Sequence, residues 1–120
     1  RKLKQLGYNN AEVIGMSVAG ETTAGGLERL SSLMVKQPDI VVLGLGGNDV
    51  IRGISPDIIY KNLVHILSRL IEDRVYVIML GIKAPPNMGY AYSQQVDTVY
   101  QRLAGYYKVE YYPFVLEGIY

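Results

Sequence analysis

The residues best placed for chemistry follow an apolar run in the first half of the chain. Residues 40–45 are aliphatic apart from one glycine, and Gly46 and Gly47 then lead to the polar side chains of Asn48 and Asp49. A short apolar run without polar alternation is typical of a strand that is buried on both faces. In an open parallel sheet, functional groups gather at the carboxyl ends of the strands. Asn48 is therefore the first candidate for a functional side chain.

Gly20 follows the preceding predicted strand and provides a possible second donor beside Asn48. The backbone N–H of Gly20 and the side-chain amide of Asn48 can meet at the tips of neighbouring strands. Two uncharged, preorganised donors are what a developing oxyanion needs. Simple turn formation explains both residues equally well, because glycine and asparagine are common in tight turns. The residues alone leave both interpretations open.

Three other motifs are similar to functional sequences but depart from them. Residues 44–49 begin like a dinucleotide fingerprint, but Asp49 replaces the last glycine. The carboxylate of Asp49 would repel a pyrophosphate, and we expect no helix to begin directly after this motif. Residues 20–25 have the glycine spacing of a phosphate-binding loop without its Lys and Ser/Thr. Ser17 lies in a near match to a nucleophile elbow, but the predicted helix starts too late for an elbow. We interpret Ser17 as a polar residue at a strand end.

His65 is the single histidine of the chain, and its predicted position argues against catalysis. It lies nine residues beyond the predicted helix start at Pro56, which corresponds to about 13 Å along a helix. Its neighbours at helical spacing are all polar: Lys61, Asn62, Ser68 and Arg69. We therefore expect His65 on the solvent face, and no catalytic triad of Ser17, His65 and Asp49.

The elements that carry these residues alternate between strands and helices. Strands are predicted at residues 12–18, 40–45, 75–82 and 109–112. Helices are predicted up to Gln37, from Ser55 to Asp73, and from Ser93 to Gly105, with loops at residues 50–55 and 83–92. Because no hairpin signal separates the strands, we expect parallel strands in a single-domain, three-layer α/β/α sandwich.

Composition excludes several classes of function. A net charge of +1 over 120 residues leaves no basic footprint for nucleic acid. The absence of cysteine excludes disulfides, thiol catalysis and cysteine-based metal sites. No apolar run approaches the roughly 20 residues of a membrane-spanning helix. We therefore expect no nucleic-acid partner and no stable insertion into a membrane.

Two motifs, taken together with their separation, give the chain a family resemblance. The first is S-x-x-G-x-T, from Ser17 to Thr22, and the second is G-G-N-D, from Gly46 to Asp49. The chain resembles the SGNH (GDSL) hydrolase superfamily, and most of all its bacterial acyl-CoA thioesterase, lysophospholipase and arylesterase branch. The similarity runs through the whole chain. It implies a parallel, flavodoxin-like sheet and a serine esterase or thioesterase activity.

The resemblance also implies roles for individual residues. Gly20 and Asn48 would be oxyanion-hole donors, with the N–H of a nucleophilic serine as the third donor. Two loops would line the acyl pocket, and we expect their substrate-binding residues to be Asp49, Val50, Ile51, Arg52, Gly53, Ala84 and Pro85. The implied substrate is a small acyl ester, thioester or lysophospholipid. No metal and no cofactor is implied, and the branch is usually periplasmic or secreted.

The chain also departs from the family pattern. The G-D-S-L block and the D-x-x-H block are absent, so we expect the nucleophile, the histidine and its aspartate before Arg1 and after Tyr120. The chain would then be an internal fragment that is inactive alone. Its sheet would lack the first strand, between residues 12–18 and 39–45, and the last helix would be missing. Two unpaired strand edges would leave such a chain loosely folded or associated.

Two alternative functions remain from the sequence. One is a carbohydrate acetyl-esterase of the same superfamily. The other is an SGNH-like binding domain that has lost its catalytic triad.

Overall fold

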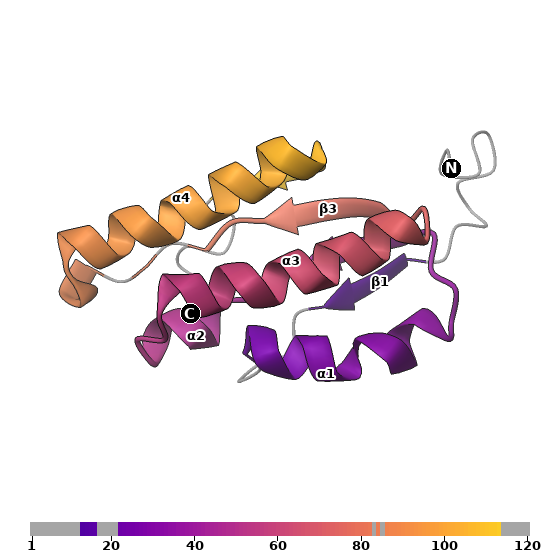
Figure 1. Ribbon diagram of the computed structural model, residues 1–120, viewed down its shortest axis with the longest axis horizontal. Helices are drawn as coiled ribbons and strands as arrows, with labels where there is room; N and C mark the ends of the chain where they lie inside the picture. Colours follow the sequence, from indigo (N-terminus) through magenta and orange to yellow (C-terminus); the bar gives the residue numbers. More distant parts are fainter. Residues whose placement is uncertain (1–12, 17–21, 83, 85, 114–120) are drawn as a thin grey trace.

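The computed structural model describes residues 13–16, 22–82, 84 and 86–113 of the chain (Figure 1). Within these residues, four parallel strands form one sheet in the order β1-β2-β3-β4. The strands are β1 (Val13–Met16), β2 (Ile40–Leu43), β3 (Tyr76–Leu80) and β4 (Glu110–Tyr112). The predicted parallel α/β class is therefore confirmed.

The helices between the strands are amphipathic, and their apolar positions face the sheet. They are α1 (Thr23–Met34), α2 (Gly47–Ile51), α3 (Pro56–Glu72) and α4 (Tyr90–Tyr107), with a 3₁₀ turn, η2 (Pro86–Met88). The start of α3 confirms the sequence prediction, because Pro56 occupies the first turn and the Ser55 hydroxyl accepts from the N–H of Asp57 at 3.2 Å.

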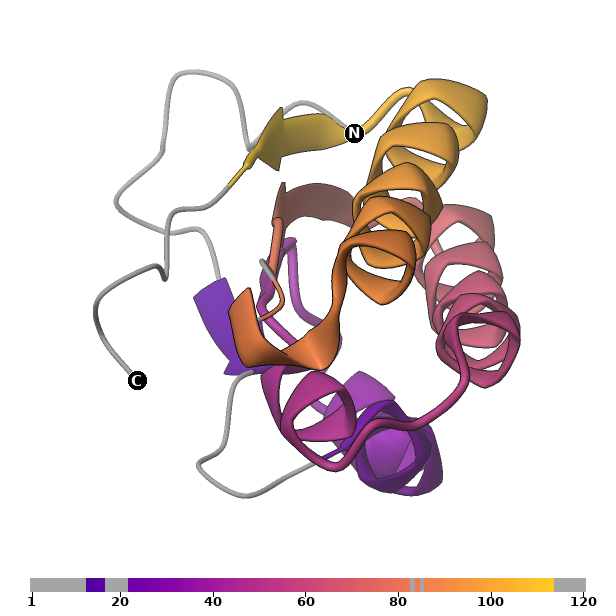
Figure 2. The ribbon, with the colours of Figure 1, turned by 90° about the vertical axis from the view of Figure 1, so that its left-hand side faces the viewer.

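The long helices α1, α3 and α4 all cover one face of the sheet, with α3 between the other two (Figure 2). No described helix of more than two turns lies on the opposite face, so the described residues form one of the two helical layers of the predicted sandwich. The prediction that the strands are buried on both faces is wrong for these residues. Burial alternates along β2 and β3, because only the face toward the helices is fully covered.

The sheet shows no gap between β1 and β2, which corrects a prediction from the sequence. The two strands pair directly in parallel, from Val13 opposite Ile40 to Met16 opposite Leu43. Direct pairing satisfies the backbone donors and acceptors that an interior gap would leave unpaired. The sheet therefore gives no support to the prediction of two unpaired interior edges, or to the loose folding that we expected from them.

Several element boundaries also differ from the predictions. The segment after Asp49, predicted as a loop, begins inside the one-turn helix α2, so a helix does open directly after β2. Helix α4 begins at Tyr90 instead of Ser93, and it continues past Gly105 to Tyr107. Lys108 ends it in the left-handed conformation at φ 55°, a cap for which glycine is the usual residue. The sequence signal for the end of a helix is weak where a residue other than glycine adopts the left-handed conformation.

The end of β2 is fixed by Tyr100 of α4. The Tyr100 ring is 1% exposed, and its hydroxyl donates to the carbonyl oxygen of Leu45 at 2.7 Å. Next to Leu45, Gly46 has a φ of 118°, and a Cβ there would overlap the Tyr100 hydroxyl. A side chain at this position is therefore excluded both by backbone conformation and by space.

A second tyrosine of α4 contacts the loop that follows α2. The Tyr92 hydroxyl donates to the carbonyl oxygen of Ile54 at 2.7 Å. Burial, and then the negative charge of Asp49, raise the pKa of Tyr92 above its ordinary value of 10.0. The neutral hydroxyl is the form that donates this hydrogen bond, so folding favours the protonated tyrosine.

We predict that Gly46→Ala lowers the free energy of unfolding by about 2–4 kcal/mol, because the left-handed backbone and the overlap with Tyr100 both oppose a Cβ. Gly105→Ala is the matched control. Gly105 lies inside α4 with open space around its Cα, so alanine there should raise the free energy of unfolding by about 0.5–1 kcal/mol. Urea denaturation followed by circular dichroism measures both, and equal effects would contradict the assignment.

The hydrogen bond of Tyr92 should become visible through its pH dependence. Because the pKa of Tyr92 is raised in the folded state, the contribution of its hydrogen bond to stability is complete below pH 10. That contribution is lost as the pH rises through the pKa of Tyr92 in the folded state. Tyr92→Phe should therefore cost about 1 kcal/mol at pH 8. The difference from the wild type should shrink above pH 10, and a difference that is constant up to pH 11 would contradict this account.

Candidate active site

Asn48 occupies the second position of α2, directly beyond the end of β2, as the sequence suggested. The residue is half-buried, but its side-chain nitrogen Nδ2 is fully buried. Within the described part of the chain, Nδ2 has no hydrogen-bond partner. A buried donor without an acceptor is unfavourable by about 1–3 kcal/mol, and a catalytic role is one of the explanations for such groups in native proteins. Asn48 is therefore an uncharged donor with free capacity at a strand tip.

Asp49, the next residue, is almost completely buried and is held by Thr23 at the start of α1. The Thr23 N–H donates to Oδ1 of Asp49, and the Thr23 hydroxyl donates to Oδ2, both at 2.7 Å. Asn62 of α3 adds a third member, because its Nδ2 donates to the Thr23 hydroxyl oxygen at 3.1 Å. These bonds connect the beginnings of α1 and α2 to the middle of α3.

The local sequence explains why Asp49 binds at this place. Thr23 is the first residue of α1, so its N–H has no acceptor within the helix. The hydroxyl of Thr22 accepts from the N–H of Gly25, at 3.2 Å, and the N–H of Thr23 turns to another partner. A carboxylate is favoured there because it meets the positive end of the helix dipole. Asp49 thus caps α1 from a different part of the chain.

This arrangement gives Asp49 a structural role, and its predicted contact with substrate stays a prediction. Its side chain is 1% exposed, and both carboxylate oxygens accept from Thr23. Val50 and Ala84, also predicted to line the acyl pocket, are 1% and 3% exposed and belong to the apolar core. The contacts that the structure shows for these three residues are structural, and their predicted role at the acyl pocket stays a prediction.

The other predicted site residues are either at the surface or outside the described residues. Ile51, the last residue of α2, and Arg52 and Gly53, which follow it, are exposed, and Gly53 has a φ of 68°. Gly20, Pro85 and also Ser17 lie outside the described residues. His65 is exposed on α3, as predicted, so the triad with Asp49 that the sequence argued against has no support here either.

Sequence reasoning missed Thr23 and Asn62. Thr23 carries no functional signal in the sequence, and Asn62 is expected on the solvent face of α3 with the other polar neighbours of His65. Thr23 is 0% exposed and Asn62 is half-buried. Their hydrogen bonds span 26 and 39 residues, and no pattern in a single sequence reports contacts of that range.

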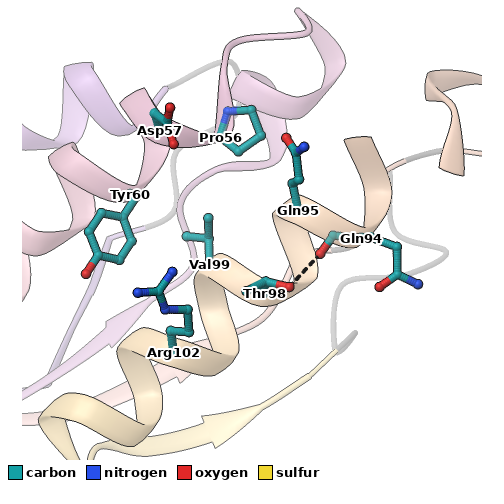
Figure 3. A pocket seen from close by; sticks show the side chains of 8 residues that line it. All are labelled: Pro56, Asp57, Tyr60, Gln94, Gln95, Thr98, Val99 and Arg102. Carbon is teal, nitrogen blue, oxygen red and sulfur yellow. Dashed lines mark hydrogen bonds between the residues drawn. The ribbon is translucent and has the colours of Figure 1, made fainter. Parts of the chain in front are cut away.

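A surface hollow of about 360 Å³ lies on the helical layer, between α3 and α4 (Figure 3). The Arg102 guanidinium lies over the Tyr60 ring there, 5.7 Å from its centroid. None of the predicted site residues lines this hollow. It is therefore separate from the site at the strand tips.

Two further observations limit what the described residues can do. They include no group of three His, Cys, Asp or Glu side chains that could hold a metal ion. None of the helices in the described ranges is long and apolar enough to cross a membrane.

Comparison with known proteins supports the predicted resemblance. Esterase TesA of Pseudomonas aeruginosa is 38% identical over 120 residues, which cover 99% of this chain and 59% of the relative. Thioesterase 1/protease 1/lysophospholipase L1 of Escherichia coli K12 is 32% identical over 113 residues, covering 93% of this chain and 54% of the relative. The chain thus spans little more than half the length of these relatives.

A solved structure agrees with the sequence comparison. The crystal structure of AlinE4, an SGNH-hydrolase family esterase, matches with a TM-score of 0.80 and 38% identity over 85% of this chain and 56% of that chain. The sequence pattern of the GDSL-like lipase/acylhydrolase family matches residues 1–119. The predicted superfamily is confirmed, and this chain belongs to the GDSL-like lipase/acylhydrolase family.

Proposed function

We propose that this chain supplies oxyanion-binding residues to a serine hydrolase that cleaves acyl esters, thioesters or lysophospholipids. The observation that carries the proposal is the buried Nδ2 of Asn48, a donor without a partner in the described residues at the tip of β2. Membership of a family of lipases and acylhydrolases supports the reaction class. The names of the two relatives, an esterase and a thioesterase/lysophospholipase, support the substrate class.

In the proposed reaction, a serine from another part of the protein attacks the acyl carbonyl carbon, and a histidine takes the serine proton. The carbonyl oxygen becomes an oxyanion, to which Nδ2 of Asn48 and the N–H of Gly20 donate. When the tetrahedral intermediate collapses, the bond to the alcohol or thiol breaks and the histidine returns the proton to the leaving group. Water then releases the acyl group by the same steps. No metal or cofactor takes part in this proposal.

The amide of Asn48 suits the oxyanion role and no other catalytic role. It has no pKa in the range where acids and bases work, so it can neither accept nor supply the transferred proton. Its value lies in being fixed before the charge develops, in a site that excludes water. Removing one such donor typically costs about 10²–10³ in kcat.

We further propose that Ile51, Arg52 and Gly53 contact the acyl group or the leaving group, together with Pro85. The exposure of the first three, one turn beyond Asn48, supports this assignment. The family resemblance favours a periplasmic or secreted protein. The two alternatives, a carbohydrate acetyl-esterase and a binding domain without a triad, have no observation of their own in the described residues.

We predict that Asn48→Ala lowers kcat by about 10²–10³ in the protein expressed from the complete open reading frame that encodes this chain. The affinity for substrate should change little, because the donor acts on the intermediate. Hydrolysis of p-nitrophenyl butyrate and of an acyl-CoA measures the effect. Gln101→Ala, on the exposed side of α4, is the control and should leave kcat unchanged. An Asn48→Ala variant with full kcat would disprove the assignment.

The 120-residue chain alone should show no ester hydrolysis above the rate in buffer, because the proposal places the serine and the histidine elsewhere. The same assay on the purified chain tests this expectation. Turnover by the chain that disappears with Asn48→Ala would refute it. In the complete open reading frame, the proposal requires a G-D-S block before Arg1 and a D-x-x-H block after Tyr120, so a frame that lacks both would favour a binding domain.

A further inference from the structure

Three polar side chains from three helices form one continuous chain of hydrogen bonds beside Asn48. Asn62 donates to Thr23 at 3.1 Å, and Thr23 donates through its hydroxyl and its N–H to the two oxygens of Asp49 at 2.7 Å. Asp49 is the residue directly after Asn48, in the same helical turn. The position of that turn is therefore coupled to α1 and α3.

The centre of the network is buried, and both Asp49 oxygens and the Thr23 hydroxyl oxygen accept a hydrogen bond. Thr23 is 0% exposed and Asp49 is 1% exposed. A carboxylate at such a depth persists only when it is paired, and its two oxygens have separate donors here. The hydroxyl of Thr23 accepts from Asn62 and donates to Asp49, so its orientation is set from both sides. A network satisfied in this way has one low-energy arrangement.

Helix α2 needs such an external constraint because it cannot fix itself. It has five residues, and its N-cap, Gly46, makes no side-chain hydrogen bond to the helix. One helical turn is unstable in water without tertiary contacts. The orientation of the Asn48 side chain is thus set by the contacts of the neighbouring residues. Asp49 makes the strongest of these contacts.

We propose that Thr23 and Asn62, acting through Asp49, are positioning residues that orient Asn48 for its oxyanion role. The proposal rests on the proposed function. An oxyanion donor must lie within about 2.7–3.1 Å of the developing charge, and a misplacement of about 1 Å can cost up to 10² in rate. Thr23 and Asn62 contact no reacting atom, so their effect on the reaction passes through the position of Asn48.

The test replaces the Thr23 hydroxyl in the protein expressed from the complete open reading frame. Thr23→Val keeps the shape of the side chain but leaves Oδ2 of Asp49 and Nδ2 of Asn62 without this partner. Thr23→Ser keeps the hydroxyl. Thr98→Val is the matched control, because Thr98 is exposed on α4 and its hydroxyl donates only to a backbone carbonyl of its own helix.

We measure kcat per active site, counted by titration of the reactive serine with a fluorophosphonate, so that only folded enzyme contributes. Thr23→Val should lower this kcat about tenfold with KM changed less than about twofold. Thr23→Ser should recover most of the loss, and Thr98→Val should match the wild type. A Thr23→Val enzyme with wild-type kcat per titrated site would overturn the proposal, and so would equal losses for valine and serine.

A second variant decides the case if Thr23→Val gives no titratable enzyme. Asn62→Ala removes only the outer bond of the network at a half-buried position, and it should lower kcat per site about threefold, whereas an unchanged kcat overturns the proposal. The Asn48→Ala variant distinguishes a failure of the positioning role from a failure of the proposed function. If Asn48→Ala lowers kcat and the Thr23 and Asn62 variants do not, only the positioning role fails. If Asn48→Ala has no effect, the oxyanion role itself fails.

Discussion

The arrangement of the site depends on one interaction, the pair of hydrogen bonds from Thr23 to the buried carboxylate of Asp49. Asp49 belongs to the first turn of α2 and caps the first turn of α1, so a single side chain serves two helix starts. Both helices follow strands that pair directly, β1 and β2. The carboxylate thus fixes the position of α1 relative to α2, the two helices that follow these parallel strands. Without this carboxylate, the N–H of Thr23 would lose its acceptor, and the short helix α2 would lose its hydrogen bonds to α1.

A second set of contacts fixes the strand end from the other side. The Tyr100 hydroxyl binds the carbonyl of Leu45, and the space this requires is available only because Gly46 has no side chain. Tyr92 binds the loop beyond α2 through Ile54. Asn48 therefore stands between a contact to α1 and contacts to α4, and its Nδ2 is the one buried side-chain nitrogen or oxygen without a hydrogen-bond partner among the described residues. A rigid surround with a free buried side-chain donor is the arrangement expected for a preorganised site.

The sequence predicted those features that depend on local physics. The apolar runs of β2 and β3, the start of α3 at Ser55 and Pro56, and the exposed position of His65 all follow from spacing and capping within a few residues. The predictions failed where a distant contact decides. Residues 50 and 51 were expected in a loop because a five-residue helix that begins at a glycine carries no helical period. Asp49 was assigned to the substrate from the family resemblance alone, and no local pattern predicts its hydrogen bonds to Thr23, 26 residues away.

The charge of Asp49 raises a physical question, since a carboxylate next to an oxyanion donor should oppose the negative charge of the intermediate. The structure offers an answer. Both oxygens accept hydrogen bonds from Thr23, and the carboxylate lies at the positive end of α1, a helix of twelve residues whose dipole offsets part of its charge. An amide at position 49 would avoid the repulsion, but its NH₂ group would take the place of one of the two oxygens to which Thr23 donates. The need for an acceptor at both positions favours an acid beside Asn48.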